Sequence, residues 1–220
     1  MKFCKEKGLH YISDELFAMS DFGEEKEFVS ALALVGDGEG EESPMDASKV
    51  HVIYSMSKDF GAAGIRSGFV ISPRNRPVLD GSIIANFMQT SILNDHFLTA
   101  LCNFPTLPTI ITTLKTHLAK NDALVTEAFD SWAIDYLPTT AGFHVFAKLG
   151  KDAQTWEEEE DIVKRFLDCG VMVGPGKGFG GIDGQVGWIR ISFSIEEKKV
   201  KEGLRRIGKT LGLKKESGAV

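Results

Sequence analysis

Residues 54–66 read YSMSKDFGAAGIR, and more about the fold can be inferred from them than from any other part of the chain. One lysine, Lys58, stands between the hydroxyls of Ser55 and Ser57 and precedes an arginine, Arg66. A lysine amine can condense with an aldehyde, and hydroxyl and guanidinium groups are donors that hold a phosphate dianion. The glycines allow the backbone to approach a ligand closely. The stretch therefore suits a lysine that holds a phosphorylated aldehyde.

The stretch resembles the cofactor-lysine signature of fold-type I pyridoxal-phosphate enzymes, in particular the class I/II aminotransferases and the related 1-aminocyclopropane-1-carboxylate synthases. That motif reads S-x-S-K-D-x-G-x-x-G-x-R, and every fixed position is met between Ser55 and Arg66. The resemblance implies that Lys58 is the catalytic residue and forms a Schiff base with pyridoxal 5'-phosphate. It also implies that Ser55, Ser57 and Arg66 bind the cofactor. An ordinary exposed turn is the alternative interpretation of such a glycine-rich sequence.

A second landmark lies upstream, at Asp14. Residues 9–13 have the pattern of a short buried strand, and the acid follows at once. The resemblance assigns Asp14 to the pyridine nitrogen of the cofactor, where a carboxylate keeps the ring protonated. Taken alone, an aspartate after a strand is more often a turn or cap residue. Relatives carry a tyrosine where this chain has Phe17, so we expect its hydrogen bond to the cofactor's phenolic oxygen to be absent and the Schiff-base pKa to be affected.

A third landmark is the stretch GWIRISF at residues 187–193, which alternates as a strand and carries one arginine. The planar fork of an arginine can hold a carboxylate through two parallel hydrogen bonds. The resemblance implies that Arg190 binds the carboxylate of an amino-acid substrate, and the alternative is a surface arginine on an edge strand. The glycine-rich residues 173–181 lack the Walker pattern and the acid and helix of a dinucleotide fingerprint. They resemble the family's loop before the carboxylate arginine.

Composition limits the classes of function. A hydrophobic fraction of 43% with 25% charged residues is typical of a soluble globular chain, and the net charge of −6 argues against a nucleic-acid partner. The chain shows neither a long apolar run nor a signal-peptide pattern, so we expect a cytoplasmic protein with no membrane partner. The scattered cysteines Cys4, Cys102 and Cys169 fit reduced thiols, and the histidine spacing implies no metal.

The order of elements predicts an α/β fold. By the resemblance, it is the C-terminal part of an aspartate-aminotransferase-like large domain, with a mixed sheet and helices, followed by an α/β small domain. A long helix joins the two domains in that family, so we expect residues 1–108 to be the remainder of the large cofactor-binding domain and 109–220 to be the linking helix and small domain. The elements predicted by periodicity are strands at 49–54, 67–71 and 142–148, and helices at 80–101 and 109–132.

Two further helices are predicted in the small domain. Capping-box patterns begin at Thr155 and at Ser194. The acidic run at residues 157–160 is expected to be a solvated first turn, favoured by the helix dipole. Residues 36–44 are acidic and glycine-rich, which predicts a mobile surface loop. The apolar residues expected to face inward are Ile162, Val163, Phe166, Leu167, Val200, Leu204, Ile207 and Leu211.

The resemblance covers nearly all of this chain but only the latter half of the family. We therefore expect a truncated chain, or one whose missing half is another polypeptide. The expected function is that of a pyridoxal-phosphate-dependent aminotransferase or 1-aminocyclopropane-1-carboxylate-synthase-like lyase that acts on an amino acid through Lys58. A homodimer is expected where the full family chain is present. The alternative is a catalytically inactive, truncated remnant with a structural or interaction role, which Phe17 and the missing half favour.

Overall fold

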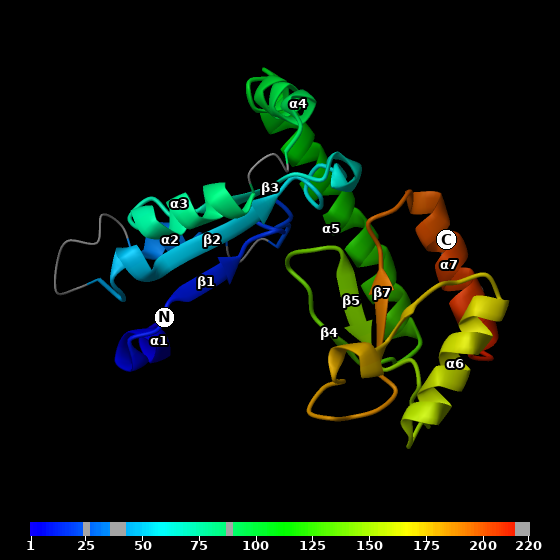
Figure 1. Cartoon of the computed structure of the whole chain (residues 1–220). Helices are drawn as coiled ribbons and strands as arrows, with labels where there is room; N and C mark the ends of the chain where they lie inside the picture. The colour runs from blue at the N-terminus through cyan, green and yellow to red at the C-terminus, as the bar shows by residue number, and fades with distance from the viewer. Residues whose placement is uncertain (24–26, 36–42, 87–89, 214–220) are drawn as a thin grey trace. The chain divides into compact units, whose positions relative to one another are not determined.

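The computed structural model describes residues 1–23, 27–35, 43–86 and 90–213. The chain divides into two compact units, Met1–Leu114 and Lys115–Val220, and the division falls inside helix α5 (Leu107–Ser131). Each unit contains one β-sheet with helices, so the predicted α/β class is confirmed (Figure 1). Most of the expected acidic loop at residues 36–44 lies outside the described residues.

The first unit is built on a mixed three-stranded sheet. Strand β1 (Tyr11–Asp14) pairs in parallel with β2 (Val50–Ser55), and β2 pairs antiparallel with β3 (Gly68–Ile71). These strands confirm the predicted ones to within two residues. Because β1 and β2 are parallel, Asp14 and Ser55, the last residues of the two strands, lie at the same edge of the sheet.

One face of this sheet carries the core of the first unit. Val50 and Val52 of β2 are almost fully buried and pack with helix α2 (Ala31–Val35), the short helix η1 (Ala47–Lys49) and Met45. Alternating strand residues place the two valines on the same side of the sheet. At the start of the chain, helix α1 (Lys2–Lys7) ends at Gly8, whose φ of 67° lies in the left-handed region that suits glycine.

The helix predicted over residues 80–101 is wrong, because two helices lie there. Helix α3 (Arg76–Ala85) ends at Asn86, whose side chain donates to the Ser82 carbonyl at 2.8 Å. Helix α4 (Ile92–Cys102) begins after Ser91, whose hydroxyl oxygen accepts from the Leu93 N–H at 3.2 Å. Asparagine and serine side chains that bond to nearby backbone favour helix ends over helix interiors. Phe87, which the prediction placed inside the helix, lies outside the described residues.

The predicted long helix is confirmed as α5, which begins and ends within two residues of the expected limits. Its buried side chains in the second unit, Leu118, Asn121, Val125 and Phe129, recur at helical spacing. The Asn121 amide donates to the carbonyls of Phe193 and Ile195, both at 2.8 Å. One polar side chain therefore fixes the chain that leaves the second sheet.

The second unit holds an antiparallel sheet of four strands in the order β4-β5-β7-β6. The strands are β4 (Tyr136–Leu137), β5 (His144–Ala147), β6 (Gly174–Pro175) and β7 (Ile189–Ser192). Val145 and Ala147 of β5, with Ile189 and Ile191 of β7, are buried on one face. Buried residues of α5, α6 (Trp156–Asp168) and α7 (Glu197–Thr210) complete this core, including Phe129, Phe166 and Ile207.

The two predicted capping boxes have different outcomes. The first is confirmed: the Thr155 hydroxyl accepts from the Glu158 N–H, and the Glu158 carboxylate accepts from the Thr155 N–H, both at 3.2 Å. The second is wrong, because α7 begins only at Glu197 and its N-cap residue makes no side-chain capping bond. The bond from Asn121 to the Ile195 carbonyl holds the chain at Ser194 out of a helix.

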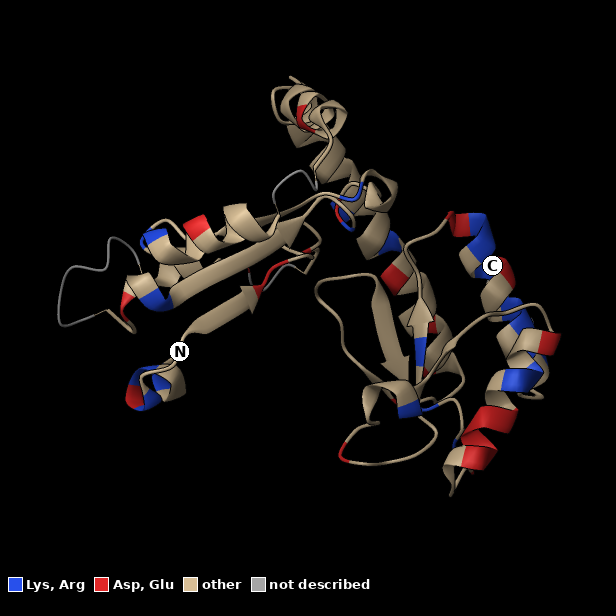
Figure 2. Cartoon of the chain, viewed as in Figure 1, with Lys and Arg blue, Asp and Glu red and all other residues tan. Residues whose placement is uncertain are grey.

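Two expectations about side-chain burial in α6 are also wrong. Leu167 is 59% exposed, although its spacing predicted an inward position. Glu159 is fully buried, although the acidic run was expected to be solvated. Figure 2 shows the acidic start of α6 and the mixed charges along α7. Sequence charge alone did not reveal that one of these glutamates points into the unit.

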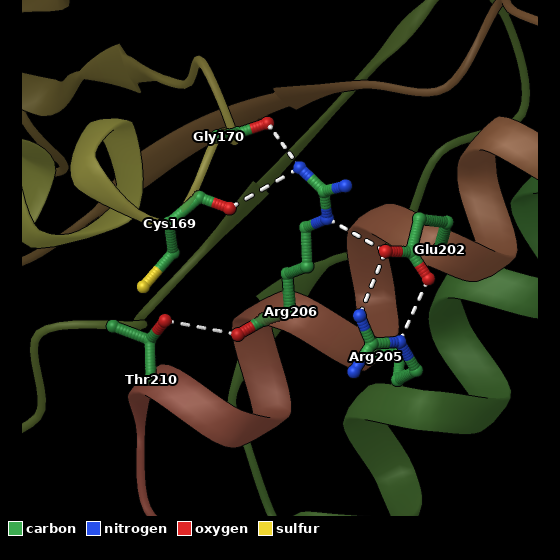
Figure 3. A network of polar contacts seen from close by, with 6 residues as sticks. All are labelled: Cys169, Gly170, Glu202, Arg205, Arg206 and Thr210. Carbon is green, nitrogen blue, oxygen red and sulfur yellow. Dashed lines mark hydrogen bonds and ion pairs between the residues drawn. The ribbon is translucent and has the colours of Figure 1, made fainter.

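A polar network joins α7 to the end of α6 (Figure 3). Glu202 accepts two hydrogen bonds from Arg205 and one from Arg206, each 2.7 Å long. These bonds lower the pKa of Glu202 to about 2. Arg206 also donates to the carbonyls of Cys169 and Gly170, at 3.3 and 3.2 Å. The carbonyls at the end of α6 thus receive a cation, which the helix dipole favours.

No single helix in the described ranges is both long and apolar enough to cross a membrane, and α4 and α5 meet those criteria only as a pair bent by 84°. No group of three or more His, Cys, Asp or Glu side chains that could hold a metal occurs among the described residues. The three cysteines are free thiols.

Candidate functional site

The lysine turn, residues 55–66, connects β2 to β3 in the first unit. The Phe60 and Ala62 N–H groups both donate to the Met56 carbonyl, and the Gly61 N–H donates to that of Lys58. Gly61 has a φ of 61°, a conformation that glycine adopts without strain. Lys58 is exposed on this turn, so its amine is available to a ligand.

Asp59 anchors the lysine turn. Its carboxylate is buried, with 4% of the residue exposed. It accepts hydrogen bonds from the Tyr54 hydroxyl at 3.0 Å, from the Met19 N–H at 3.1 Å and from the Ser20 hydroxyl. Burial raises the pKa of Tyr54, and the Asp59 charge raises it further, so the phenol remains a donor. These bonds tie the lysine turn to the segment that follows β1.

Asp59 is a fixed position of the lysine motif, but its anchoring role could not be predicted from the sequence. In the sequence, Asp59 is visible only as an acidic residue next to Lys58. Nothing in the sequence identifies Tyr54 or Ser20 as its hydrogen-bond partner. The partners lie about 40 residues upstream for Met19 and Ser20. A separation of that length leaves no periodic trace in a sequence.

Phe17 lies next to Lys58, with the lysine Nζ 5.6 Å from the ring centroid. This distance is within the range of a cation–π contact. Asp14 is exposed at the end of β1, and its carboxylate accepts from the Leu16 N–H at 3.3 Å. The same sheet edge therefore carries Asp14, the Phe17 ring and the lysine turn.

The predicted phosphate ligands lie along the lysine turn. Ser55 is buried, and its hydroxyl oxygen accepts from the Ser57 N–H at 3.3 Å. Arg66 is exposed, and one of its guanidinium nitrogens donates to the Ala63 carbonyl at 2.9 Å. Its φ of 55° is left-handed, a conformation that costs a non-glycine residue about 1 kcal/mol or more. Such strain is concentrated at functional positions, which agrees with the predicted role.

The functional groups of the first unit fit pyridoxal phosphate. Lys58 presents an amine for the aldehyde, and Asp14 presents a carboxylate at the same sheet edge for a ring nitrogen. Ser55, Ser57 and Arg66 supply hydroxyl and guanidinium donors for a phosphate. This donor set contains neither the histidine nor the thiolate ligands that are typical of zinc sites.

Arg190 lies in the second unit, as the second residue of β7. Because β7 pairs with β5 on one side and β6 on the other, the alternative of a surface arginine on an edge strand is wrong. Its guanidinium carbon lies 4.2 Å from the ring centroid of Phe179. The Arg190 side chain makes no hydrogen bond or ion pair with any other residue in the described part of the chain. Its planar donors are therefore available to a carboxylate.

A chain of aromatic contacts without a predicted role lies beside Arg190. Phe146 is its partner on β5 and contacts Phe179 edge-to-face, with ring centroids 6.3 Å apart. Trp188 stacks on Phe146 at 5.8 Å. On the other side, Gly174 of β6 faces Arg190, and an added Cβ would lie 3.3 Å from the arginine Nε. The sequence signal was alternation along β7, which places Trp188 and Arg190 on one face.

Comparison with known proteins identifies the family. The model for aminotransferase class I and II matches residues 1–207. The probable aminotransferase aclI of Aspergillus oryzae is 34% identical over 217 residues, which are 96% of this chain and 51% of that protein. The 1-aminocyclopropane-1-carboxylate synthase 6 of Oryza sativa subsp. japonica is 32% identical, over 88% of this chain and 35% of that protein. The chain spans about half the length of the first of these relatives.

Solved structures show the same fold. An aspartate aminotransferase from Thermus thermophilus with maleate matches with a TM-score of 0.76 at 19% identity, over 94% of this chain and 50% of that one. An aromatic aminotransferase from Pyrococcus horikoshii matches with a TM-score of 0.78 at 19% identity, over 96% and 52%. The predicted aspartate-aminotransferase-like fold is thus confirmed. The motif around Lys58, the fold and the family match agree, and the chain belongs to the class I and II aminotransferases, a family that depends on pyridoxal phosphate.

Proposed function

We propose that this chain forms part of the active site of a pyridoxal-phosphate-dependent enzyme that acts on an amino acid, either as an aminotransferase or as a 1-aminocyclopropane-1-carboxylate-synthase-like lyase. The observation that carries the proposal is the placement of Lys58. It stands exposed on a turn that the buried Asp59 fixes, at the sheet edge that also carries Asp14. Family members of both reaction types are similar in sequence to this chain.

Each site residue has a proposed role. Lys58 holds the cofactor covalently through its amine and later moves the proton at the α carbon of the substrate. Asp14 keeps a proton on the pyridine nitrogen, while Ser55, Ser57 and Arg66 hold the phosphate. When bound, the cofactor supplies an electron sink for the bond that breaks at the α carbon. Arg190 orients the substrate by its carboxylate.

At Phe17 the proposed site differs from that of family members that carry tyrosine at this position. A phenylalanine ring has no hydroxyl, so it donates no hydrogen bond to a cofactor oxygen. Its ring instead offers a cation–π contact to the protonated amine of Lys58, 5.6 Å away. We infer that Phe17 contributes to the site through this ring contact rather than through a hydroxyl.

The visible absorption spectrum of the purified chain mixed with pyridoxal phosphate tests the proposal. We expect a band near ~420 nm that disappears in Lys58→Ala. Lys7→Ala, which removes an exposed lysine of the same unit outside the site, should retain the band. Borohydride reduction followed by peptide mass analysis should place a permanent adduct on Lys58. A spectrum independent of Lys58 would favour the alternative, a non-catalytic family member.

The proposal includes a cytoplasmic homodimer, as expected from the resemblance to the family. Light scattering coupled to size-exclusion chromatography measures the mass of the particle in solution. A mass of two chains supports the dimer, and a mass of one chain contradicts it for this chain alone.

A further inference from the structure

Glu159 is a buried carboxylate whose hydrogen-bond donors, within the described part of the chain, are backbone N–H groups. It lies in the first turn of α6, and 0% of the residue is exposed. Its two oxygens accept from backbone groups: Oε1 from the Lys177 N–H at 2.9 Å and Oε2 from the Gly187 N–H at 2.7 Å. Among the described residues it forms no ion pair. Burial of a carboxylate costs free energy unless the carboxylate is hydrogen-bonded, so a buried glutamate at this position requires a structural or functional explanation.

The two N–H donors belong to two segments that adjoin the strand pair around Arg190. Lys177 lies in the short helix η3 (Gly176–Phe179), which directly follows β6. Gly187 lies two residues before β7 begins. Strand β7 carries Arg190, and β6 pairs with it, with Gly174 opposite the arginine. One carboxylate therefore fixes the segment before β7 and the segment after β6.

Gly176 allows this close approach. An added Cβ there would overlap the Trp188 carbonyl and would lie 3.2 Å from the Glu159 Oε2. Only a glycine lets η3 pack against both the carboxylate and β7. The position of η3 is therefore determined by contacts on two sides.

The last residue of η3 is Phe179, and its ring lies under the Arg190 guanidinium. The guanidinium carbon is 4.2 Å from the ring centroid, while the ring itself packs edge-to-face on Phe146. A guanidinium stacked on an aromatic ring keeps its in-plane N–H groups free for a carboxylate. The orientation of those N–H groups depends on where η3 holds the ring.

We propose that Glu159 is a positioning residue for Arg190: by fixing η3 and the start of β7, it keeps Phe179 under the guanidinium and so presents the N–H edge to a carboxylate. This inference rests on the role of Arg190 in the proposed function. Glu159 touches neither substrate nor cofactor in this account. It acts through the backbone at Lys177 and Gly187.

The neighbouring Glu160 provides a matched control. It contacts the same lysine, but through the side chain, with its Oε1 2.8 Å from the Lys177 Nζ. Both partners of this ion pair are about half exposed, with side-chain exposures of 51% and 45%. A Glu160→Gln variant therefore removes a carboxylate next to Lys177 while leaving the backbone bond in place.

Nuclear magnetic resonance on the full chain, without cofactor, tests the proposal. The Phe179 ring current should shift the side-chain resonances of Arg190 away from those of Arg165, an exposed arginine. Glu159→Gln and Phe179→Leu should both move the Arg190 resonances toward the Arg165 values, and Glu160→Gln should leave them unchanged. An unchanged Arg190 spectrum in a folded Glu159→Gln would overturn the proposal.

Titration with succinate, a simple dicarboxylate, adds a binding readout. We expect the dissociation constant measured at Arg190 to rise about tenfold in Glu159→Gln, which converts to about 1.4 kcal/mol. If wild-type chain binds no succinate while Glu159→Gln still moves the Arg190 resonances, the positioning stands and the carboxylate role of Arg190 fails. The positioning role of Glu159 and the carboxylate-binding role of Arg190 can thus be refuted independently of each other.

A measurement on wild-type protein keeps the proposal falsifiable if Glu159→Gln does not fold. Relaxation of the Arg190 Nε–H bond should show an order similar to that of the Lys177 and Gly187 amides. An Arg190 as mobile as Arg165 would overturn the proposal, because a positioned guanidinium cannot move like a free one.

Discussion

Replacing Asp59 with alanine should destabilise the first unit and loosen the lysine turn. The carboxylate accepts three hydrogen bonds, from Tyr54, Met19 and Ser20, and is buried. A hydrogen bond to a charged group contributes about 1.5–3 kcal/mol, so three bonds set an upper limit of about 4.5–9 kcal/mol. Loss of the carboxylate also removes its own desolvation penalty, which offsets part of this. We expect the free energy of unfolding to fall by about 3 kcal/mol.

Urea unfolding followed by circular dichroism measures this loss, and two variants calibrate it. Tyr54→Phe removes a single donor to the carboxylate and should cost about 1.5 kcal/mol, the lower end of that range. Asp80→Ala removes a half-exposed aspartate that pairs with Arg76 on α3, and should change stability by less than about 0.5 kcal/mol. The three variants should therefore rank by the number of buried hydrogen bonds that each one removes.

The same substitution should weaken cofactor binding, because the turn that presents Lys58 loses its anchor. We expect a higher dissociation constant for pyridoxal phosphate in Asp59→Ala, measured by the Lys58-dependent absorption band. If Asp59→Ala unfolds at the same urea concentration as wild type, the three bonds do not hold the turn and the reasoning is refuted.

Three further predictions concern single positions. Phe17→Tyr should lower the pH midpoint of the Lys58-dependent band, since a hydroxyl that donates to the cofactor's oxygen favours the unprotonated lysine nitrogen; an unchanged midpoint would show that the ring does not reach the cofactor. The pKa of His51 is lowered by burial and by the neighbouring His10, so the unfolded chain binds more protons and stability should fall as the pH drops below the ordinary value of 6.5. His51→Gln should flatten that dependence in urea unfolding measured on both sides of this pH, and equal slopes would contradict the assignment. Gly174→Ala would place a Cβ 3.2 Å from the Phe179 ring and 3.3 Å from the Arg190 Nε, so succinate binding should weaken while stability changes by about 1–3 kcal/mol at most; undiminished binding would show that the glycine is not needed there.

Regular elements were predictable from sequence where a local period determined them. The strands around the lysine turn, the helix α5 and the Thr155 capping box each depend on residues a few positions apart. The helix break near Asn86 was missed because two capping residues outweighed a continuous apolar pattern. Leu167 was misplaced because helical spacing gives a face but not the width of the surface that covers it.

The site residues likewise divide into those that a local motif predicts and those whose role depends on distant contacts. Lys58, Ser55, Ser57 and Arg66 belong to one motif and were recognisable as a set. Asp59 and Glu159 were not assigned a role, because each bonds to groups 18 or more residues away, apart from Tyr54. Buried polar contacts of this kind are created by the tertiary fold, and a sequence shows only a charged residue.

Because the Met19 amide donates to Asp59, its hydrogen exchange reports on the opening of the lysine turn. Its hydrogen can exchange with solvent only when the carboxylate withdraws, so its exchange rate reports how often the turn opens. The sheet amides of β2 report the opening of the strands themselves. If Met19 exchanges as slowly as they do, turn and sheet open as one cooperative unit, and a chain that loses the lysine turn also loses the sheet beneath it.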